Sequence, residues 1–144
     1  MELYLKELLR WEDAATAYNI YKDCMYLPTE EKYRRKMQCF LQEDATKVFA
    51  CLCGDERKGV VVLSLFPQGC AELVGIAVEE SSRRQGIGTF MLRQVMETCA
   101  LQAVFAETDD DAVEFYRKIG FSVEKHIETY DGKSVVRYQC ALHR

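Results

Sequence analysis

The chain has 144 residues, of which 49% are hydrophobic and 29% are charged, and its formal net charge is −4 at pH 7. These values are typical of one soluble globular domain, and they exclude a disordered chain and a membrane-spanning one, since no apolar run approaches roughly 20 residues. The acidic balance argues against a nucleic-acid binder. The first residues lack the basic start and apolar middle of a signal peptide, so we expect a cytoplasmic protein with no membrane partner.

The cysteines and histidines indicate neither a disulfide framework nor a metal site. Seven cysteines, an odd number, occur in a chain without an export signal, so reduced thiols are expected. Because cysteine packs like a small apolar residue, five of them are expected in or near the core: Cys39, Cys51, Cys53, Cys99 and Cys140. His126 and His143 stand alone in the sequence, and we predict no bound metal.

The N-terminal segment is expected to form a strand followed by two helices. Apolar residues at 3 and 5 alternate with polar ones, which favours a strand, although leucines at 8 and 9 follow at helical spacing. Asp13 is a candidate cap for a helix that continues to about Cys24.

The second helix is marked more clearly. Pro28-Thr29 predicts a break and an N-terminal cap, and the helix then extends from about Glu30 to Gln42. The link between the two helices, residues 24–28, is interpreted from composition alone as a plain turn with Tyr26 half buried.

Two β-rich runs follow, Lys47 to Cys53 and Val60 to Phe66. The polar spacer 54–59 is flanked by glycines and predicts a hairpin loop. Residues 67–69 then turn the chain into an apolar strand over residues 71–78. Gly75 interrupts this strand, and an interior glycine often marks a bulge or a close backbone approach.

The stretch after this strand predicts an anion site. A basic turn with two close glycines, Gly86 and Gly88, leads into a helix-patterned run to Leu101. The first N–H groups of a helix are unpaired, and its dipole favours negative charge there. Arg83 and Arg84 bring positive charge to the same turn, so a phosphate fits this place.

The C-terminal part continues with a strand, a short helix and a hairpin. Residues 103–107 predict a strand parallel to the previous one, reached by a right-handed crossover. The next helix has Asp110 or Asp111 as a cap, and Gly120 lies just past its end. The tail predicts two strands joined by a turn at residues 130–133.

Two of these segments resemble signatures of the GNAT superfamily of N-acetyltransferases. Arg83-Arg84-Gln85-Gly86-Ile87-Gly88 is similar to its pyrophosphate loop, whose pattern is Gln or Arg, two residues, Gly, one residue, then Gly or Ala. Ile76-Ala77-Val78 stands at the family's offset from that loop. Ala112-x-x-Phe115-Tyr116-Arg117-Lys118-Ile119-Gly120-Phe121 resembles the second signature, so the resemblance covers about the second half of the chain.

The resemblance implies a fold and an activity. We expect a single α/β (α+β) domain over residues 1–144, with a mixed, mostly antiparallel sheet, splayed parallel strands 4 and 5 and flanking helices. The cosubstrate would be acetyl-CoA, and the acceptor would be an amine on a small molecule or a protein. In such a fold the link at residues 24–28 would form part of the acceptor pocket. The oligomeric state is open, a homodimer included.

The resemblance also implies the cofactor-binding residues. They comprise the strand segment that would offer backbone N–H groups to the oxyanion, the loop with the helix start, and residues near the second signature. In order they are Ile76, Ala77, Val78, Arg83, Arg84, Gln85, Gly86, Ile87, Gly88, Thr89, Asp109, Phe115 and Tyr116. Asp109 departs from the family, which commonly has an asparagine there; an ionised carboxylate accepts hydrogen bonds but donates none.

The implied catalytic residues are Glu72 and Tyr116. Glu72 resembles the glutamate that histone acetyltransferases of the superfamily place on this strand, and a buried carboxylate has the raised pKa that suits a base. The alternatives are a surface role for Glu72, with Glu107 or a water as the base. Tyr116 stands at the position of the general acid that protonates the leaving thiolate; its alternative is one more residue of the helix's apolar face.

A rival interpretation from another functional class remains. A catalytically silent acyl-CoA-binding or regulatory domain would keep the loop and tolerate the loss of Glu72 or Tyr116. The presence of both side chains favours the enzyme. A plain nucleotide-binding module is disfavoured because the chain has no Gly-x-x-x-x-Gly-Lys-Ser/Thr loop.

Overall fold

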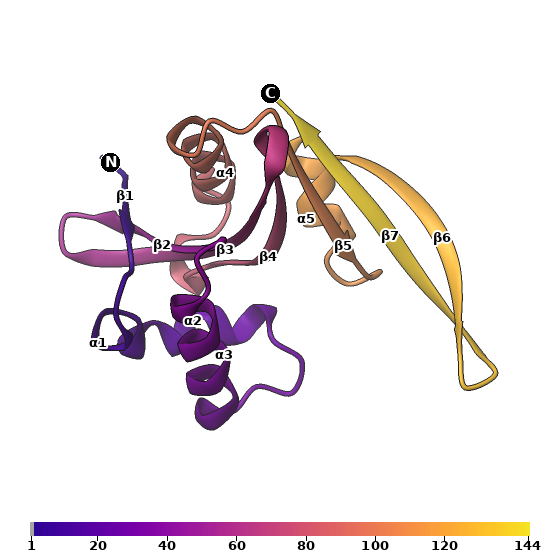
Figure 1. Ribbon diagram of the computed structural model, residues 1–144, viewed down its shortest axis with the longest axis horizontal. Helices are drawn as coiled ribbons and strands as arrows, with labels where there is room; N and C mark the ends of the chain where they lie inside the picture. Colours follow the sequence, from indigo (N-terminus) through magenta and orange to yellow (C-terminus); the bar gives the residue numbers. More distant parts are fainter. Residues whose placement is uncertain (1) are drawn as a thin grey trace.

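The computed structural model describes residues 2–144, and its centre is one seven-stranded sheet with the order β1-β2-β3-β4-β5-β7-β6 (Figure 1). The strands are β1 (Tyr4–Glu7), β2 (Thr46–Cys53), β3 (Glu56–Phe66), β4 (Cys70–Val78), β5 (Ala103–Thr108), β6 (Ser122–Tyr130) and β7 (Lys133–His143). Among the described strands, β4 and β5 are the parallel pair and the other neighbours are antiparallel. The expected mixed, mostly antiparallel sheet is confirmed.

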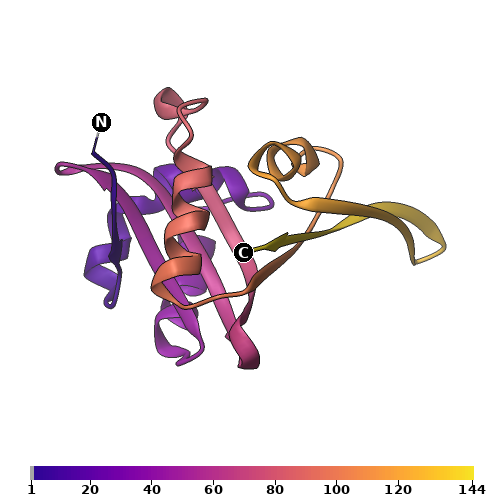
Figure 2. The ribbon, with the colours of Figure 1, turned by 90° about the horizontal axis from the view of Figure 1, so that it is seen from above.

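Helices cover both faces of the sheet (Figures 1 and 2). They are α1 (Trp11–Ala14), α2 (Tyr18–Tyr21), α3 (Glu30–Gln42), α4 (Ile87–Thr98) and α5 (Val113–Ile119). Four 3₁₀ turns lie between them: η1 (Ala15–Ala17), η2 (Lys22–Cys24), η3 (Pro67–Gly69) and η4 (Glu80–Ser82). Figure 2 shows α4 against β2, β3 and β4, while the β6–β7 hairpin extends away from the body. None of the helices in residues 2–144 is long and apolar enough to cross a bilayer.

Each face of the sheet has its own apolar core. Met91 and Val95 of α4 pack with Val61 on one face, and Tyr33 and Met37 of α3 pack with the other. Strand β3 contributes to both cores because successive side chains of a strand point to opposite faces. Burial of these apolar side chains is the main favourable contribution that attaches the helices to the sheet.

Strand β4 contains a bulge, and its pairing with β5 stops early. Against β3, Leu73 pairs with Leu63 and Gly75 pairs with Val62, so Val74 is an extra residue. β4 pairs with β5 only over Cys70 to Glu72. Beyond Glu72 the two parallel strands diverge, which confirms the distortion predicted from Gly75.

The first predicted helix differs from expectation. It is broken into α1, η1, α2 and η2, and its N-terminal cap is Arg10 with no side-chain bond, whereas Asp13 lies inside α1. One physical reason is that the hydroxyl of Tyr33 donates to the carbonyl of Ala14 at 2.6 Å, at the point where the α-helix gives way to a 3₁₀ turn. The second helix is confirmed from Glu30 to Gln42, with the Thr29 hydroxyl accepting from the amide of Lys32.

Three smaller expectations are also wrong. The predicted loop 54–59 is a two-residue turn at Gly54-Asp55, because β3 begins at Glu56 and its polar start pairs with the end of β2. Helix α4 ends at Thr98 and does not continue to Leu101. Cys39 is exposed on α3, whereas Cys51 and Cys140 are buried as expected and Cys53 and Cys99 are half-buried.

Candidate functional site

The divergence of β4 and β5 opens a cleft of about 1170 Å³. Its walls come from the end of β4, the start of α4, the end of β5, helix α5 and the segment Asp23 to Tyr26. Twelve residues of the predicted cofactor set line it: Ile76, Ala77, Val78, Arg83, Arg84, Gly86, Ile87, Gly88, Thr89, Asp109, Phe115 and Tyr116. Gln85 is exposed and lies outside the lining.

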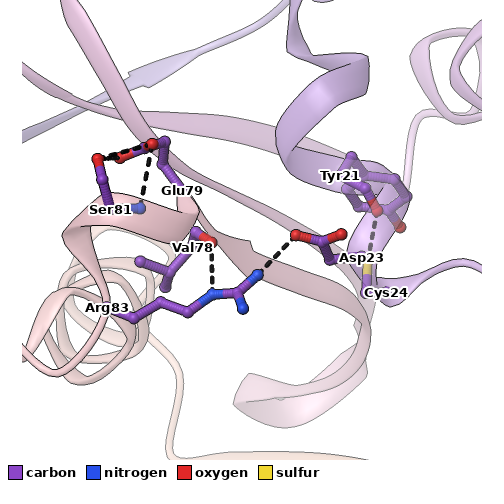
Figure 3. Close-up of polar contacts among 7 residues, drawn as sticks. All are labelled: Tyr21, Asp23, Cys24, Val78, Glu79, Ser81 and Arg83. Carbon is purple, nitrogen blue, oxygen red and sulfur yellow. Dashed lines mark hydrogen bonds and ion pairs between the residues drawn. The ribbon is translucent and has the colours of Figure 1, made fainter.

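A hydrogen-bonded turn leads from β4 to the helix start (Figure 3). The carboxylate of Glu79 accepts from the amide and hydroxyl of Ser81 and from the hydroxyl of Ser82. These bonds favour the ionised form and hold the pKa of Glu79 down to about 2. The carboxylate is therefore ionised in the neutral pH range and able to accept these bonds.

The start of α4 is shaped to accept an anion. Gly86 is the N-terminal cap with a φ of 77°, a left-handed conformation that glycine adopts without steric cost. A Cβ at Gly86 would have no described atom of another segment within 4 Å, so the space beside this residue is open to the cleft. The amides of Ile87, Gly88 and Thr89 belong to the first turn, whose N–H groups lack intrahelical partners.

Gly88 has a packing role instead. A Cβ there would lie 3.0 Å from the Cζ of Phe115, so the glycine lets α5 approach the first turn of α4 closely. The two glycines of the loop thus have different structural roles. Gly86 sets the backbone conformation, and Gly88 brings the two helices together.

Gly75 allows another close approach, that of the Tyr21 hydroxyl to β4. A Cβ at Gly75 would lie 2.1 Å from the hydroxyl oxygen and 2.7 Å from Cζ of the ring. Tyr21 is 3% exposed, and burial raises the pKa of its phenol far above its usual value. The buried ring therefore lies directly against the diverging part of β4.

We predict that Gly75→Ala destabilises the protein by about 1–3 kcal/mol, the usual cost of overpacking, because Tyr21 must move. The measurement is the free energy of unfolding from urea denaturation, with the same dependence on urea concentration assumed for both proteins. The matched background is Tyr21→Phe, in which the alanine should cost less because the closest atom is absent. A Gly75→Ala variant as stable as the natural chain would show that the contact is loose.

Tyr116 is buried beside the cleft, with 9% of its surface exposed. Its ring makes edge-to-face contacts with Phe115 at 5.6 Å and Phe121 at 5.2 Å between centroids. Burial raises the pKa of its phenol to about 12, so the hydroxyl carries its proton at neutral pH. It is available as a hydrogen-bond donor at the cleft wall.

The two candidate bases have different positions. Glu72 is exposed at the last position of β4 that pairs with β5, between Ser64 and Phe105, and is outside the cleft lining. Glu107, on β5, lines the cleft, and its carboxylate accepts from Nε of Arg137 at 3.1 Å. The role of either glutamate stays a prediction, but the geometry gives Glu107 access to a molecule in the cleft.

Asp109 holds the turn before α5. Its Oδ1 accepts from the amides of Asp111 and Ala112 at 3.0 and 3.1 Å. The expected cap at Asp110 or Asp111 is wrong, because Ala112 is the N-terminal cap and Asp110 accepts from the hydroxyl of Tyr138 at 2.6 Å. The end of the helix at Gly120, with a φ of 114°, is confirmed.

Sequence reasoning missed a polar group next to Glu107. Ligand atoms of Glu107, His126 and Glu128 lie within 4.8 Å of one another, and Nε2 of His126 is 2.8 Å from Oε1 of Glu128. Arg137 joins the group through Glu107. These residues come from three strands, and no motif or spacing in the sequence points to the pairing that brings them together.

The diverging strands, the glycine loop and the helix start that faces the cleft together define the class of protein: an N-acetyltransferase fold. The chain belongs to the acetyltransferase (GNAT) family, whose sequence model matches residues 14–121. No curated protein gives a significant match.

Solved structures with this fold cover nearly the whole chain. A GNAT-family protein from Desulfovibrio desulfuricans has 18% identity and a TM-score of 0.75, covering 99% of each chain. A Bacillus subtilis acetyltransferase in complex with CoA has 17% identity and a TM-score of 0.67, again covering 99% of each. The ribosomal-protein-S18-alanine N-acetyltransferase of Escherichia coli has 19% identity and a TM-score of 0.69, covering 99% of this chain and 94% of that one.

Proposed function

We propose that this protein transfers an acetyl group from acetyl-CoA to a primary amine by direct attack through a tetrahedral intermediate. The observation that carries the proposal is the cleft itself, which runs from the open start of α4 past the unpaired edge of β4 to Tyr116 and Glu107. We further propose that residues 1–144 form one cytoplasmic domain.

The residues at the helix start fit the phosphates of CoA. Gly86 leaves open space, the first-turn amides of α4 face a position that favours an anion, and Arg84 is exposed on the cleft wall. The edge of β4 beyond Glu72 can pair with an amide-bearing chain as an added strand would. Bound there, acetyl-CoA supplies a thioester, the acyl donor of the reaction.

The chain's own groups supply the remaining roles. Backbone N–H groups over Ile76 to Val78 are proposed to stabilise the oxyanion. We propose Glu107 as the group that accepts the amine's proton, directly or through a water, with Glu72 as the alternative. Tyr116 is proposed to donate a proton to the departing thiolate.

We propose only the chemical class of the acceptor, a primary amine. Solved structures of the same fold include enzymes named for different amines, the alanine of ribosomal protein S18 and spermidine. Liquid chromatography with mass spectrometry can follow a panel of such amines, including spermidine and an N-terminal alanyl peptide, with acetyl-CoA. Binding of CoA with no acetylated product from any amine would favour the silent regulatory domain.

For the loop, we predict that Gly86→Trp raises the dissociation constant for CoA by at least about tenfold while the chain stays folded. The reason is that the side chain would project into open space, where the cofactor is proposed to lie. Calorimetry measures the affinity. Gly86→Asn is the matched control, because asparagine tolerates the left-handed conformation and is small. Undiminished CoA affinity in a folded Gly86→Trp variant would contradict the loop assignment.

A further inference from the structure

Arg83, on the loop before α4, contacts Asp23, and both residues line the cleft (Figure 3). Its Nη2 donates to Oδ2 of Asp23 at 2.6 Å, and its Nε donates to the carbonyl of Val78 at 3.2 Å. Asp23 lies in η2, sixty residues earlier in the sequence. The guanidinium therefore connects the end of β4 to the segment that follows α2.

The connected segment is a wall of the cleft. Asp23, Cys24, Met25 and Tyr26 all line it. The thiol of Cys24 donates to the carbonyl of Tyr21 at 3.2 Å and lies against the backbone N–H of Ile76. Cys24 is exposed as a residue, but partial desolvation of its thiol raises the pKa to about 11. The segment is thus packed against the β4 edge where the reaction is proposed to occur.

The two arginines of the loop differ in what they contact. Arg83 is paired with Asp23, and the side chains of this pair are 47% and 42% exposed. Arg84 has a φ of 66° and no ion pair among the described residues, and it also lines the cleft. A carboxylate that already accepts from Arg83 competes with any phosphate for that guanidinium, whereas Arg84 meets no such competition.

We propose that Arg83 is a positioning residue for the acceptor wall: through Asp23 it holds the segment from Lys22 to Tyr26 against β4. That this wall contacts the acceptor amine rests on the proposed function. That Arg83 holds this segment against β4 does not depend on the proposed function. On this proposal Arg83 does not belong to the cofactor-binding set expected from the sequence, and Arg84 is the loop arginine that faces the cofactor's phosphates.

The test compares Arg83→Gln with Asp23→Asn, the double variant and Arg84→Gln. The first readout is alkylation of Cys24 by N-ethylmaleimide, followed by mass spectrometry, with the exposed Cys39 on α3 as internal control. Cys24 is exposed as a residue, but its thiol is bonded to the carbonyl of Tyr21. Loosening the segment frees the thiol from that bond and increases its thiolate fraction. We expect Cys24 to react about two- to fivefold faster than in the natural chain in both Arg83→Gln and Asp23→Asn. The double variant should react no faster than either single variant, and the rate of Cys39 should be unchanged in all of them.

The second readout is CoA affinity by calorimetry. Arg83→Gln and Asp23→Asn should stay within about twofold of the natural chain, whereas Arg84→Gln should bind CoA more weakly. The third is kinetic, with the amine of the panel that is acetylated fastest. Its KM should rise about two- to fivefold in Arg83→Gln with kcat retained, and Arg83→Lys, which keeps the charge, should restore part of the loss.

Three results would overturn the inference: an unchanged Cys24 rate in Arg83→Gln, a loss of CoA affinity in Arg83→Gln equal to that in Arg84→Gln, or an unchanged KM despite a faster Cys24 rate. If no amine of the panel is acetylated, the proposed function fails by itself. The alkylation rates and CoA affinities then still decide whether Arg83 holds the segment or binds the cofactor.

Discussion

Replacing Glu107 by glutamine is expected to lower kcat about 10²–10⁴-fold and to remove the acidic limb of its pH profile, with CoA affinity nearly unchanged. A base must be ionised to accept the amine's proton, and glutamine cannot ionise, so the variant should lose the rise of rate with pH. Glutamine keeps the length of the side chain and can still accept from Arg137. Steady-state kinetics at saturating amine, with the best amine of the panel, would measure the effect.

The matched control is Glu72→Gln, on the neighbouring strand and outside the cleft lining. It should change kcat by less than about threefold if Glu107 is the base, because exposed substitutions away from the reacting atoms have small effects. A large loss in Glu72→Gln alone would transfer the role to that residue. Full activity with an intact acidic limb in both variants would leave a water held by backbone groups as the base.

Replacing Tyr116 by phenylalanine is expected to lower kcat about 10²-fold while the melting temperature and CoA affinity are retained. Phenylalanine keeps the ring contacts with Phe115 and Phe121 and removes only the proton donor. Since burial raises the pKa of Tyr116 to about 12, the phenol stays protonated between about pH 6 and 9. Its own titration should therefore produce no alkaline fall in rate within that interval.

A second acyl donor distinguishes proton donation from positioning. A thioester with a less basic leaving group needs less help from an acid, so Tyr116→Phe should slow its reaction less than that of acetyl-CoA. Equal losses for both donors would indicate that the hydroxyl positions the thioester. No loss for either donor would place Tyr116 in the core, with solvent as the acid.

The sequence was sufficient to predict features that depend on local order. The loop at 83–89, the end of α5 at Gly120 and the irregularity at Gly75 each follow from residue types with a strong backbone preference. The parallel placement of β5 followed from strand, helix and strand in succession. These are short-range signals that one sequence carries.

The rest of the site depends on contacts between distant residues. Arg83 pairs with Asp23 across sixty positions, and Arg137 pairs with Glu107 across thirty. Nothing in either neighbourhood marks its partner. The break in the first helix has the same kind of cause, since a tertiary hydrogen bond from Tyr33 reaches the backbone at Ala14. The exposure of Glu72 likewise depends on which helices reach that end of the sheet.

The extra residue in β4 changes which positions of the strand face α4. Before the bulge the odd-numbered residues Ala71 and Leu73 belong to that core, and after it the even-numbered Ile76 and Val78 do. A strict alternation of apolar and polar residues is therefore impossible along this strand. One inserted residue therefore accompanies both a shift in the phase of the hydrophobic pattern and the divergence of β4 from β5, at which the cleft lies.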